Sequence, residues 1–264
     1  MPEISPKAVV AEASGLAEDV RVGAFSVIGP DVTVGAGTVV HSHVTITGRT
    51  KIGSNCQLFP CCVVGVAPGE GTAGSCTIAD NNVLREHVIV ETGAEAGGAG
   101  TVLGPNNLLM VGCQVGHDAR LEGEGIFANL TRIEPHAWIE KFVRTAGFTV
   151  IKSYVTVGAY AFATGYASVE RDVPPYAIVH GLPSVVRSLN TENLRRCGFD
   201  PATIGILKEA FRTLFDGRAE FPDPQRLAAA EAFDNEHVRF LIDSLRRSAA
   251  SPTGRRLQPA GAED

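Results

Sequence analysis

Aliphatic side chains recur, with few exceptions, at every sixth position along most of the first 170 residues. One run extends from Val10 to Val64, and after two interruptions another extends from Leu103 to Val169. The residue four positions after each aliphatic one is usually small or β-branched, as at Ser14, Ser26, Thr38 and Cys56. A period of six matches neither an amphipathic helix nor the simple alternation of an ordinary strand. The chain is therefore built from short repeats, and these repeats dictate the fold.

Each hexad supplies one large and one small side chain for the interior of a narrow tube. Three hexads make a coil of about 18 residues, and successive coils stack as parallel strands about 4.8 Å apart. Glycine often follows the aliphatic residue, as Gly23 follows Val22, and it suits a tight corner with unusual backbone angles. The pattern predicts a mainly β protein whose residues 1–186 form a hexapeptide-repeat parallel β-helix. Three cysteines fall on small inward positions and are predicted to be buried and unreactive: Cys56, Cys62 and Cys113.

Two Gly-rich segments, 66–77 and 91–102, interrupt the period. Loops that leave a rigid scaffold can shape a site or a subunit contact, or they can be surface excursions. After Val169 a Pro-rich stretch ends the repeat, and helical patterns follow at 190–196, 201–215 and 225–248. The sequence thus predicts a second, α-helical domain over 187–264, with a disordered tail from about residue 250.

Composition narrows the classes of function. The net charge of −6 and the pI near 5.7 give no reason to expect nucleic-acid binding. No stretch has the length and apolar character of a transmembrane helix, and the N-terminus lacks the features of a signal peptide. The six cysteines form no C-x-x-C pair, so we expect reduced thiols, a cytoplasmic location and no membrane insertion.

One cluster of side chains carries candidate chemistry. His117 stands third in its hexad and is predicted to point outward, and Asp118 and His136 are 18 residues apart, so they should stack on adjacent coils. Imidazole can act as a general base near neutral pH, and a neighbouring carboxylate can orient it. A surface histidine beside a surface aspartate is the alternative that geometry leaves open.

We expect no metal and no cofactor. One class of carbonic anhydrase has a similar tube and uses three histidines at subunit boundaries, two of them separated by four residues. That pair is absent among the seven histidines of this chain.

Several segments resemble the UDP-N-acetylglucosamine O-acyltransferase family, over about residues 6–245. They are IGPDVTVGAGTVVHSHVTITGRTKIG, LGPNNLLM, VGHD around His117, ANLTRIEPH, RDVPPY and NTENLRRCGF. The resemblance implies a left-handed β-helix and a cytoplasmic homotrimer with sites between adjacent tubes. It also implies transfer of a 3-hydroxyacyl chain from acyl carrier protein to the 3-hydroxyl of UDP-N-acetylglucosamine, the first step of lipid A synthesis.

The resemblance also implies roles for individual residues. His117 matches the catalytic base and Asp118 its partner. Gly165 matches a position that limits acyl-chain length. The remaining matches lie around the substrate or its nucleotide: His136, Asn190, Glu192 and Arg196.

Several departures from the family fall around the substrate. Pro135 stands where the family commonly has a glycine whose N–H faces the oxyanion, and proline has no N–H. Lys152-Ser153 replaces a His-Gln pair, and Glu91 replaces a histidine. Lys152 and His136 are the nearest groups that could replace the missing donor, and we predict an oxyanion site rebuilt around Lys152, with a slower rate than in members with glycine.

Two alternatives to O-acylation stay open at this point. One is N-acylation of a UDP-3-amino-sugar, and the other is a homologue that binds ligand with little or no turnover. Acyl carrier proteins are acidic, so an O-acyltransferase and an N-acyltransferase would each need a basic docking patch. Candidate residues for the patch are Arg195, Arg196, Arg246 and Arg247.

Overall fold

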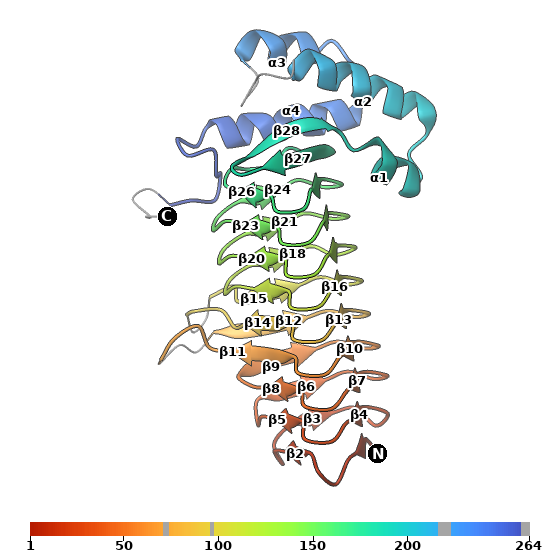
Figure 1. Cartoon of the computed structure of the whole chain (residues 1–264), viewed down its shortest axis with the longest axis vertical. Coiled ribbons are helices and arrows are strands. Elements are labelled where there is room, and N and C mark those ends of the chain that lie inside the picture. Colours follow the sequence, from red (N-terminus) through yellow and green to blue (C-terminus); the bar gives the residue numbers. More distant parts are fainter. Residues whose placement is uncertain (71–73, 96–97, 216–222, 260–264) are drawn as a thin grey trace.

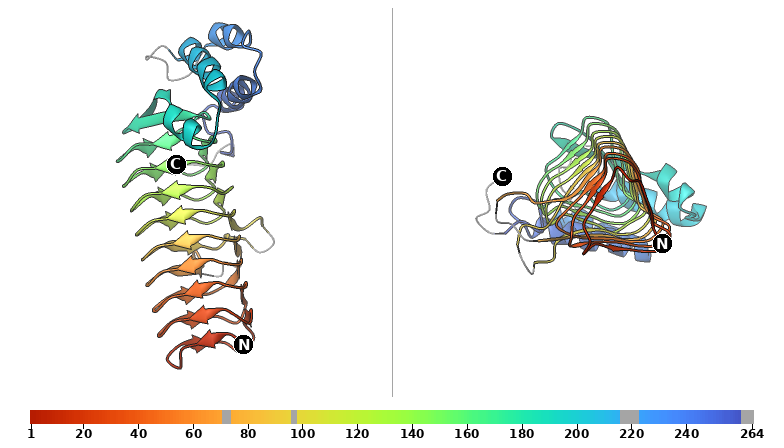
Figure 2. Two further views of the ribbon diagram at one scale, coloured as in Figure 1. Left: turned by 90° about the vertical axis from the view of Figure 1, so that its right-hand side faces the viewer. Right: turned by 90° about the horizontal axis from the view of Figure 1, so that it is seen from below.

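The computed structural model describes residues 1–70, 74–95, 98–215 and 223–259. The chain winds into a tall left-handed parallel β-helix with helices packed at its C-terminal end (Figure 1). Seen along its axis, the tube is triangular, and its three sides are three parallel sheets (Figure 2). The mainly β fold with a helical C-terminal region is therefore confirmed.

The strands are short, and every third strand returns to the same side of the tube. The first sheet contains β1 (Glu3–Ile4), β4 (Arg21–Val22), β7 (Val39–Val40), β10 (Gln57–Leu58), β13 (Val83–Leu84), β16 (Leu108–Leu109), β19 (Ile126–Phe127), β22 (Arg144–Thr145), β25 (Phe162–Ala163), β27 (Ala177–Gly181) and β28 (Ser184–Leu189). The second sheet contains β2 (Val9–Val10), β5 (Val27–Ile28), β8 (Thr45–Ile46), β11 (Val63–Val66), β14 (Ile89–Glu91), β17 (Gln114–Val115), β20 (Arg132–Ile133), β23 (Val150–Ile151) and β26 (Ser168–Val169). The third sheet contains β3 (Gly15–Leu16), β6 (Val32–Val34), β9 (Arg49–Ile52), β12 (Ser75–Ile78), β15 (Thr101–Leu103), β18 (Arg120–Leu121), β21 (Trp138–Ile139) and β24 (Thr156–Val157).

The register explains the six-residue period. Val22 pairs with Val40, and Val115 pairs with Ile133, so each aliphatic side chain stacks on its counterpart one coil away. These four side chains are at most 3% exposed and belong to the core of the tube. The small inward cysteines are buried as predicted, and burial raises the pKa of Cys62 to about 12 and that of Cys113 to about 11. Both thiols are therefore protonated and inert near neutral pH.

The role expected for the glycines needs a correction. The residues with left-handed backbone angles stand two positions after the place where these glycines occur, and most of them are not glycine, as at Phe25 and His136. Gly23 and Gly116 are needed instead because the next coil passes too close for a side chain. A Cβ atom on Gly23 would lie 2.6 Å from the backbone of His41, and one on Gly116 would lie 2.7 Å from the Pro135 nitrogen.

The tube ends in a hairpin and a helical cap. Strands β27 and β28 pair antiparallel, and strand pairing continues to Leu189, so the expected boundary at residue 186 falls inside β28. The helices are α1 (Thr191–Arg196), α2 (Pro201–Leu214), α3 (Pro224–Ala230) and α4 (Glu236–Ala249). The stretch 225–248 is thus two helices, because the Asn235 side chain accepts hydrogen bonds from His237 N and Val238 N and starts a new helix there.

The tail differs from its expected disorder. Residues 250–259 return to the tube, where Asp172 N donates to Gly254 O at 2.8 Å and Arg256 N donates to Asp172 Oδ2 at 2.9 Å. The Arg256 guanidinium also donates to Glu140 Oε1 at 2.9 Å, and both side chains are at most 12% exposed. A buried charge needs a partner, so this ion pair fixes the tail. Residues 260–264 lie outside the described part of the chain.

Among the described helices, none combines the length and the apolar character that crossing a bilayer requires.

Candidate active site

The candidate catalytic side chains share one edge of the tube. We call the turns from the first to the second sheet the first edge, those from the second to the third sheet the second edge, and those from the third back to the first the third edge. His117 and Asp118 follow β17, His136 follows β20 and Lys152 follows β23, so all four lie on the second edge in consecutive coils.

His117 and Asp118 form an oriented pair. His117 Nδ1 lies 2.9 Å from Asp118 Oδ2, and the two side chains are 23% and 16% exposed. Partial burial opposes ionisation of Asp118, but the hydrogen bonds from Ala94 N–H and His117 outweigh it and lower the pKa of that carboxyl. The ionised carboxylate favours a proton on Nδ1 of a neutral His117, which leaves the other ring nitrogen, Nε2, as an acceptor.

The second Gly-rich segment holds this pair in place. Ala94 N donates to Asp118 Oδ2 at 3.0 Å, and Asp118 N donates to Thr101 Oγ1 at 2.9 Å. Glu91 Oε2 accepts a hydrogen bond from His117 N at 2.9 Å. Residues at both ends of the segment therefore contact His117 and Asp118, as expected of a loop that shapes a site. The sequence marked Glu91 only as a departure from the family, and it gave no signal for Ala94.

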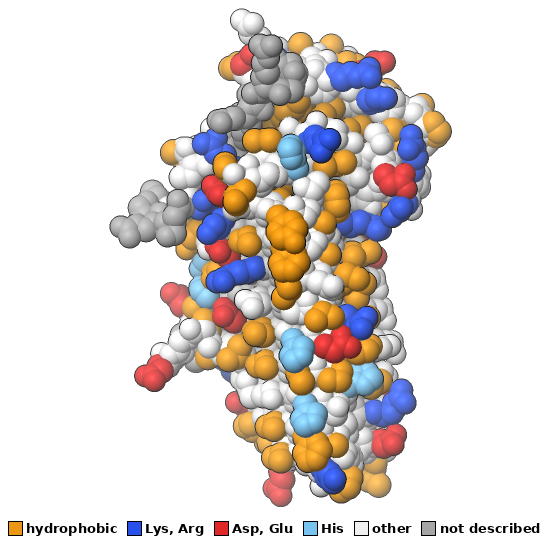
Figure 3. Space-filling model, viewed as in Figure 1, with side chains coloured by type: hydrophobic (Ala, Val, Ile, Leu, Met, Phe, Trp, Pro, Cys, Tyr) orange, Lys and Arg blue, Asp and Glu red, His pale blue; other side chains and the backbone are white. Residues whose placement is uncertain are grey.

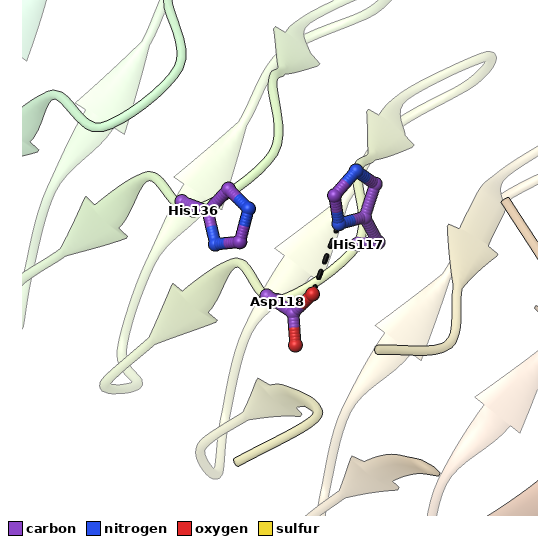
Figure 4. Close-up of side chains that lie close together, drawn as sticks. All are labelled: His117, Asp118 and His136. Atoms are coloured by element: carbon purple, nitrogen blue, oxygen red, sulfur yellow. Dashed lines mark hydrogen bonds and ion pairs between the residues drawn. The ribbon is translucent and has the colours of Figure 1, made fainter. Parts of the chain in front are cut away.

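His136 belongs to the same cluster. Its ring meets the His117 ring edge-on at a centroid distance of 5.0 Å, and Tyr154 stacks on its other side at 4.7 Å. Figure 4 shows His117 and His136 on either side of Asp118. Burial lowers the pKa of His136, and the neighbouring His117 lowers it further. Sequence reasoning missed Tyr154, although it stands 18 residues after His136 and the one-coil spacing could have found it.

Lys152 is held by a carboxylate. Its Nζ lies 3.5 Å from Glu134 Oε1, and its side chain is 42% exposed. Ser153 N donates to Glu134 Oε2 at 3.3 Å, so Glu134 fixes both residues of this departure from the family. The two residues line a pocket of about 210 Å³ together with Glu134, Glu170 and Arg255. The docked tail thus contributes to the second edge above His136.

The remaining predicted residues lie on other edges. Gly165 is in a turn of the first edge, between β25 and β26. Asn190 is the N-cap of α1 and donates from Nδ2 to Tyr160 O, on the third edge. Glu192 pairs with Arg196 on the exposed face of the same helix, with Oε1 and Nε 3.0 Å apart. Within a single chain, these four residues therefore lie on other edges than His117.

His117, Asp118 and His136 are also the group that could hold a metal ion within the described chain, since one donor atom from each lies within 4.8 Å of the others. The sequence expectation of no metal rested on the absence of two histidines separated by four residues, and it did not weigh Asp118 and His136, predicted on adjacent coils, as metal ligands.

Comparisons with known proteins agree with this architecture. A family model described as bacterial transferase hexapeptide (six repeats) matches residues 15–48, and one described as UDP N-acetylglucosamine O-acyltransferase, domain 2, matches residues 172–253. LpxA from Acinetobacter baumannii superposes with a TM-score of 0.84 at 31% identity, covering 92% of this chain and 96% of that one. The UDP-N-acetylglucosamine acyltransferase from Campylobacter jejuni gives a TM-score of 0.86 at 26% identity, covering 97% of this chain and all of the other.

A curated relative extends the match over nearly the whole sequence. The acyl-[acyl-carrier-protein]–UDP-N-acetylglucosamine O-acyltransferase of Stenotrophomonas maltophilia K279a is 36% identical over 250 residues, which cover 92% of this chain and 95% of that protein. With the shared tube and the helical cap, this similarity places the chain in the UDP-N-acetylglucosamine O-acyltransferase family.

Proposed function

We propose that this protein transfers a 3-hydroxyacyl chain from acyl carrier protein to the 3-hydroxyl of UDP-N-acetylglucosamine, the first step of lipid A synthesis. The observation that carries the proposal is the oriented His117–Asp118 pair on a tube whose relatives bear the name of that activity. The donor and the free cysteines favour a cytoplasmic location.

His117 acts as the general base. Its unprotonated ring nitrogen accepts the proton of the sugar hydroxyl while that oxygen attacks the thioester carbonyl. The tetrahedral intermediate then collapses, the carbon–sulfur bond breaks, and the proton on His117 goes to the departing thiolate. Asp118 stabilises the imidazolium that forms between these steps. The two substrates balance the reaction, so we propose no cofactor.

The negative oxygen of the intermediate needs a donor that Pro135 does not supply. Pro135 has no N–H, and its carbonyl accepts a hydrogen bond from Tyr154 N. Lys152 is the proposed replacement, because its ammonium lies one coil beyond Pro135 on the same edge. Its 3.5 Å contact with Glu134 both positions the ammonium and competes with the oxyanion for it, which supports the prediction of a slower rate.

A homotrimer completes the site. Gly165, Glu192 and Arg196 lie away from the second edge, so a single chain cannot present them to a substrate held by His117. Adjacent parallel tubes would bring the second edge of one copy to other edges of its neighbour. Hydrophobic side chains are frequent along the tube on the face shown in Figure 3. Exposed examples on the first edge are Val111, Leu130, Phe148 and Tyr166.

Within that assembly, α1 lies toward the nucleotide and Gly165 toward the acyl chain. Asn190 would act by fixing α1, since its amide is engaged in the helix cap. Docking of the acidic carrier protein would use the exposed arginines of α1 and α4, of which Arg195 and Arg196 pair with Glu192 and Arg246 pairs with Glu231. A solution mass equal to one chain at micromolar concentration would rule out the trimer.

Product analysis tests the activity. The enzyme is incubated with 3-hydroxyacyl carrier protein and either UDP-N-acetylglucosamine or a UDP-3-amino-sugar, and the acylated sugar is identified by mass spectrometry. We expect an ester with the first acceptor and none with His117→Ala. An amide formed only with the second acceptor would reassign the substrate, and binding without product from either would make the protein a ligand-binding homologue.

A further inference from the structure

The second edge gathers the donor set of a transition-metal site. One nitrogen of His117, one oxygen of Asp118 and one nitrogen of His136 lie within 4.8 Å of one another. Within this group, His117 Nδ1 and Asp118 Oδ2 are 2.9 Å apart. In Figure 4 the two rings flank the carboxylate, so the donors face a common space.

Little movement would close these donors around an ion. Zinc binds imidazole nitrogen at about 2.0–2.1 Å and carboxylate oxygen at about 2.0–2.2 Å, which places tetrahedral donors about 3.3–3.5 Å apart. The largest separation here therefore has to shrink by about 1.5 Å. Rotation of partly exposed side chains supplies such a shift, and both rings are only partly buried. Three protein ligands leave a fourth position for water.

The charge around the cluster favours a divalent cation. Asp118 is a ligand, Glu91 holds His117 through its backbone N–H, and the Glu95 carboxylate is close enough to act on the His136 ring. Two nitrogen donors select a borderline metal such as Zn²⁺ over Mg²⁺ or Ca²⁺, which prefer oxygen.

We propose that a Zn²⁺-type ion binds His117, Asp118 and His136 and inhibits the enzyme. A neutral imidazole has a single unprotonated nitrogen, and whichever His117 nitrogen binds the ion, that lone pair can no longer accept the proton of the sugar hydroxyl. The ion also withdraws Asp118 from its hydrogen bond to His117. Binding stands on the geometry alone, whereas inhibition rests on the proposed function.

Titration calorimetry with Zn²⁺, and the visible absorption of bound Co²⁺, test the site without any activity measurement. We expect one ion per chain, and a loss of affinity of about 100-fold or more in His136→Ala and Asp118→Asn, since changes outside the ligand set already cost about 10–100-fold. His180→Ala is the matched control because it removes an exposed histidine of β27, and its affinity should equal that of the parent.

Each result decides one part of the proposal. Unchanged Zn²⁺ affinity in folded His136→Ala would overturn the site, and His136→Gln replaces that variant if it does not fold. If acyl transfer is observed, Zn²⁺ should abolish it and a chelator should restore it. Stoichiometric binding with undiminished transfer would overturn inhibition while leaving the site intact. A protein without transfer activity that still binds Zn²⁺ would contradict the proposed function only.

Discussion

Replacing Asp118 by asparagine separates the charge of this residue from its geometry. One oxygen, Oδ2, accepts hydrogen bonds from both His117 Nδ1 and Ala94 N, at 2.9 and 3.0 Å. An asparagine can present its carbonyl oxygen to the same two donors, and it tolerates the left-handed backbone found here, where φ is 57°. Asp118→Asn should therefore keep the turn and the His117 tautomer while removing the negative charge.

The expected loss follows from the change in one hydrogen bond. A bond to a charged group contributes about 1.5–3 kcal/mol, and one between neutral groups about 0.5–1.5 kcal/mol. The difference of about 1–1.5 kcal/mol applies when His117 carries the proton, and it corresponds to a fall in kcat of about 5–12-fold. Asp118→Ala also loses the orientation of the ring, so its kcat should fall further, toward the 10²–10⁴-fold that a general base typically contributes.

Steady-state kinetics with 3-hydroxyacyl carrier protein and UDP-N-acetylglucosamine measure both variants, with His180→Ala as a control. We expect the parent to be faster than Asp118→Asn, and Asp118→Asn to be faster than Asp118→Ala. An Asp118→Asn enzyme as slow as His117→Ala would refute this order, because the amide would then have imposed the wrong tautomer. An Asp118→Asn enzyme as fast as the parent would show that the charge plays no part.

Four further outcomes are expected. His117→Ala should lower turnover about 10²–10⁴-fold and leave the solution mass unchanged, because the side chain faces outward; activity within a few-fold of the parent would move the base elsewhere. Pro135→Gly should raise turnover, whereas Lys152→Ala should lower it without weakening sugar-nucleotide binding, and a Lys152→Ala enzyme with full activity would end the idea of compensation. Arg256→Ala should lower the free energy of unfolding, measured in urea, by about 3 kcal/mol, since it leaves Glu140 buried without its partner; a loss below about 1 kcal/mol would contradict a tail fixed by this pair. The folded pKa of Asp118 lies below 3.8, so its ionised form adds stability that is present above about pH 4 and is lost as pH falls through the folded pKa. The free energy of unfolding, measured at a series of acidic pH values, should therefore fall more steeply with decreasing pH in the parent than in Asp118→Asn. Equal slopes would refute the lowered pKa.

Much of the fold could be predicted from the six-residue period. An aliphatic residue every sixth position can be buried only if three short strands make a coil, so the tube, its parallel sheets and the stacking of residues 18 apart all follow from the sequence. The closeness of Asp118 and His136, whose donor atoms lie within 4.8 Å of each other, was predictable for the same reason. So were the buried cysteines, because each occupies the small inward position of a hexad. The left-handed sense and the residues proposed to face the nucleotide came from the resemblance, since periodicity alone specifies neither.

Only the tertiary structure decided what holds the site together. Glu91 is 26 residues from His117, and Ala94 is 24 residues from Asp118. An inserted loop breaks the one-coil spacing there, and that spacing was what made the other contacts predictable. The tail was equally hidden, since Arg256 reaches Glu140 across 116 residues and no local pattern marks a buried ion pair. The folded chain also placed Gly165 and α1 on other edges than His117. A sequence repeat allows contacts between adjacent coils to be predicted. The docking of loops and tails depends instead on which buried charges and hydrogen-bond donors meet in space.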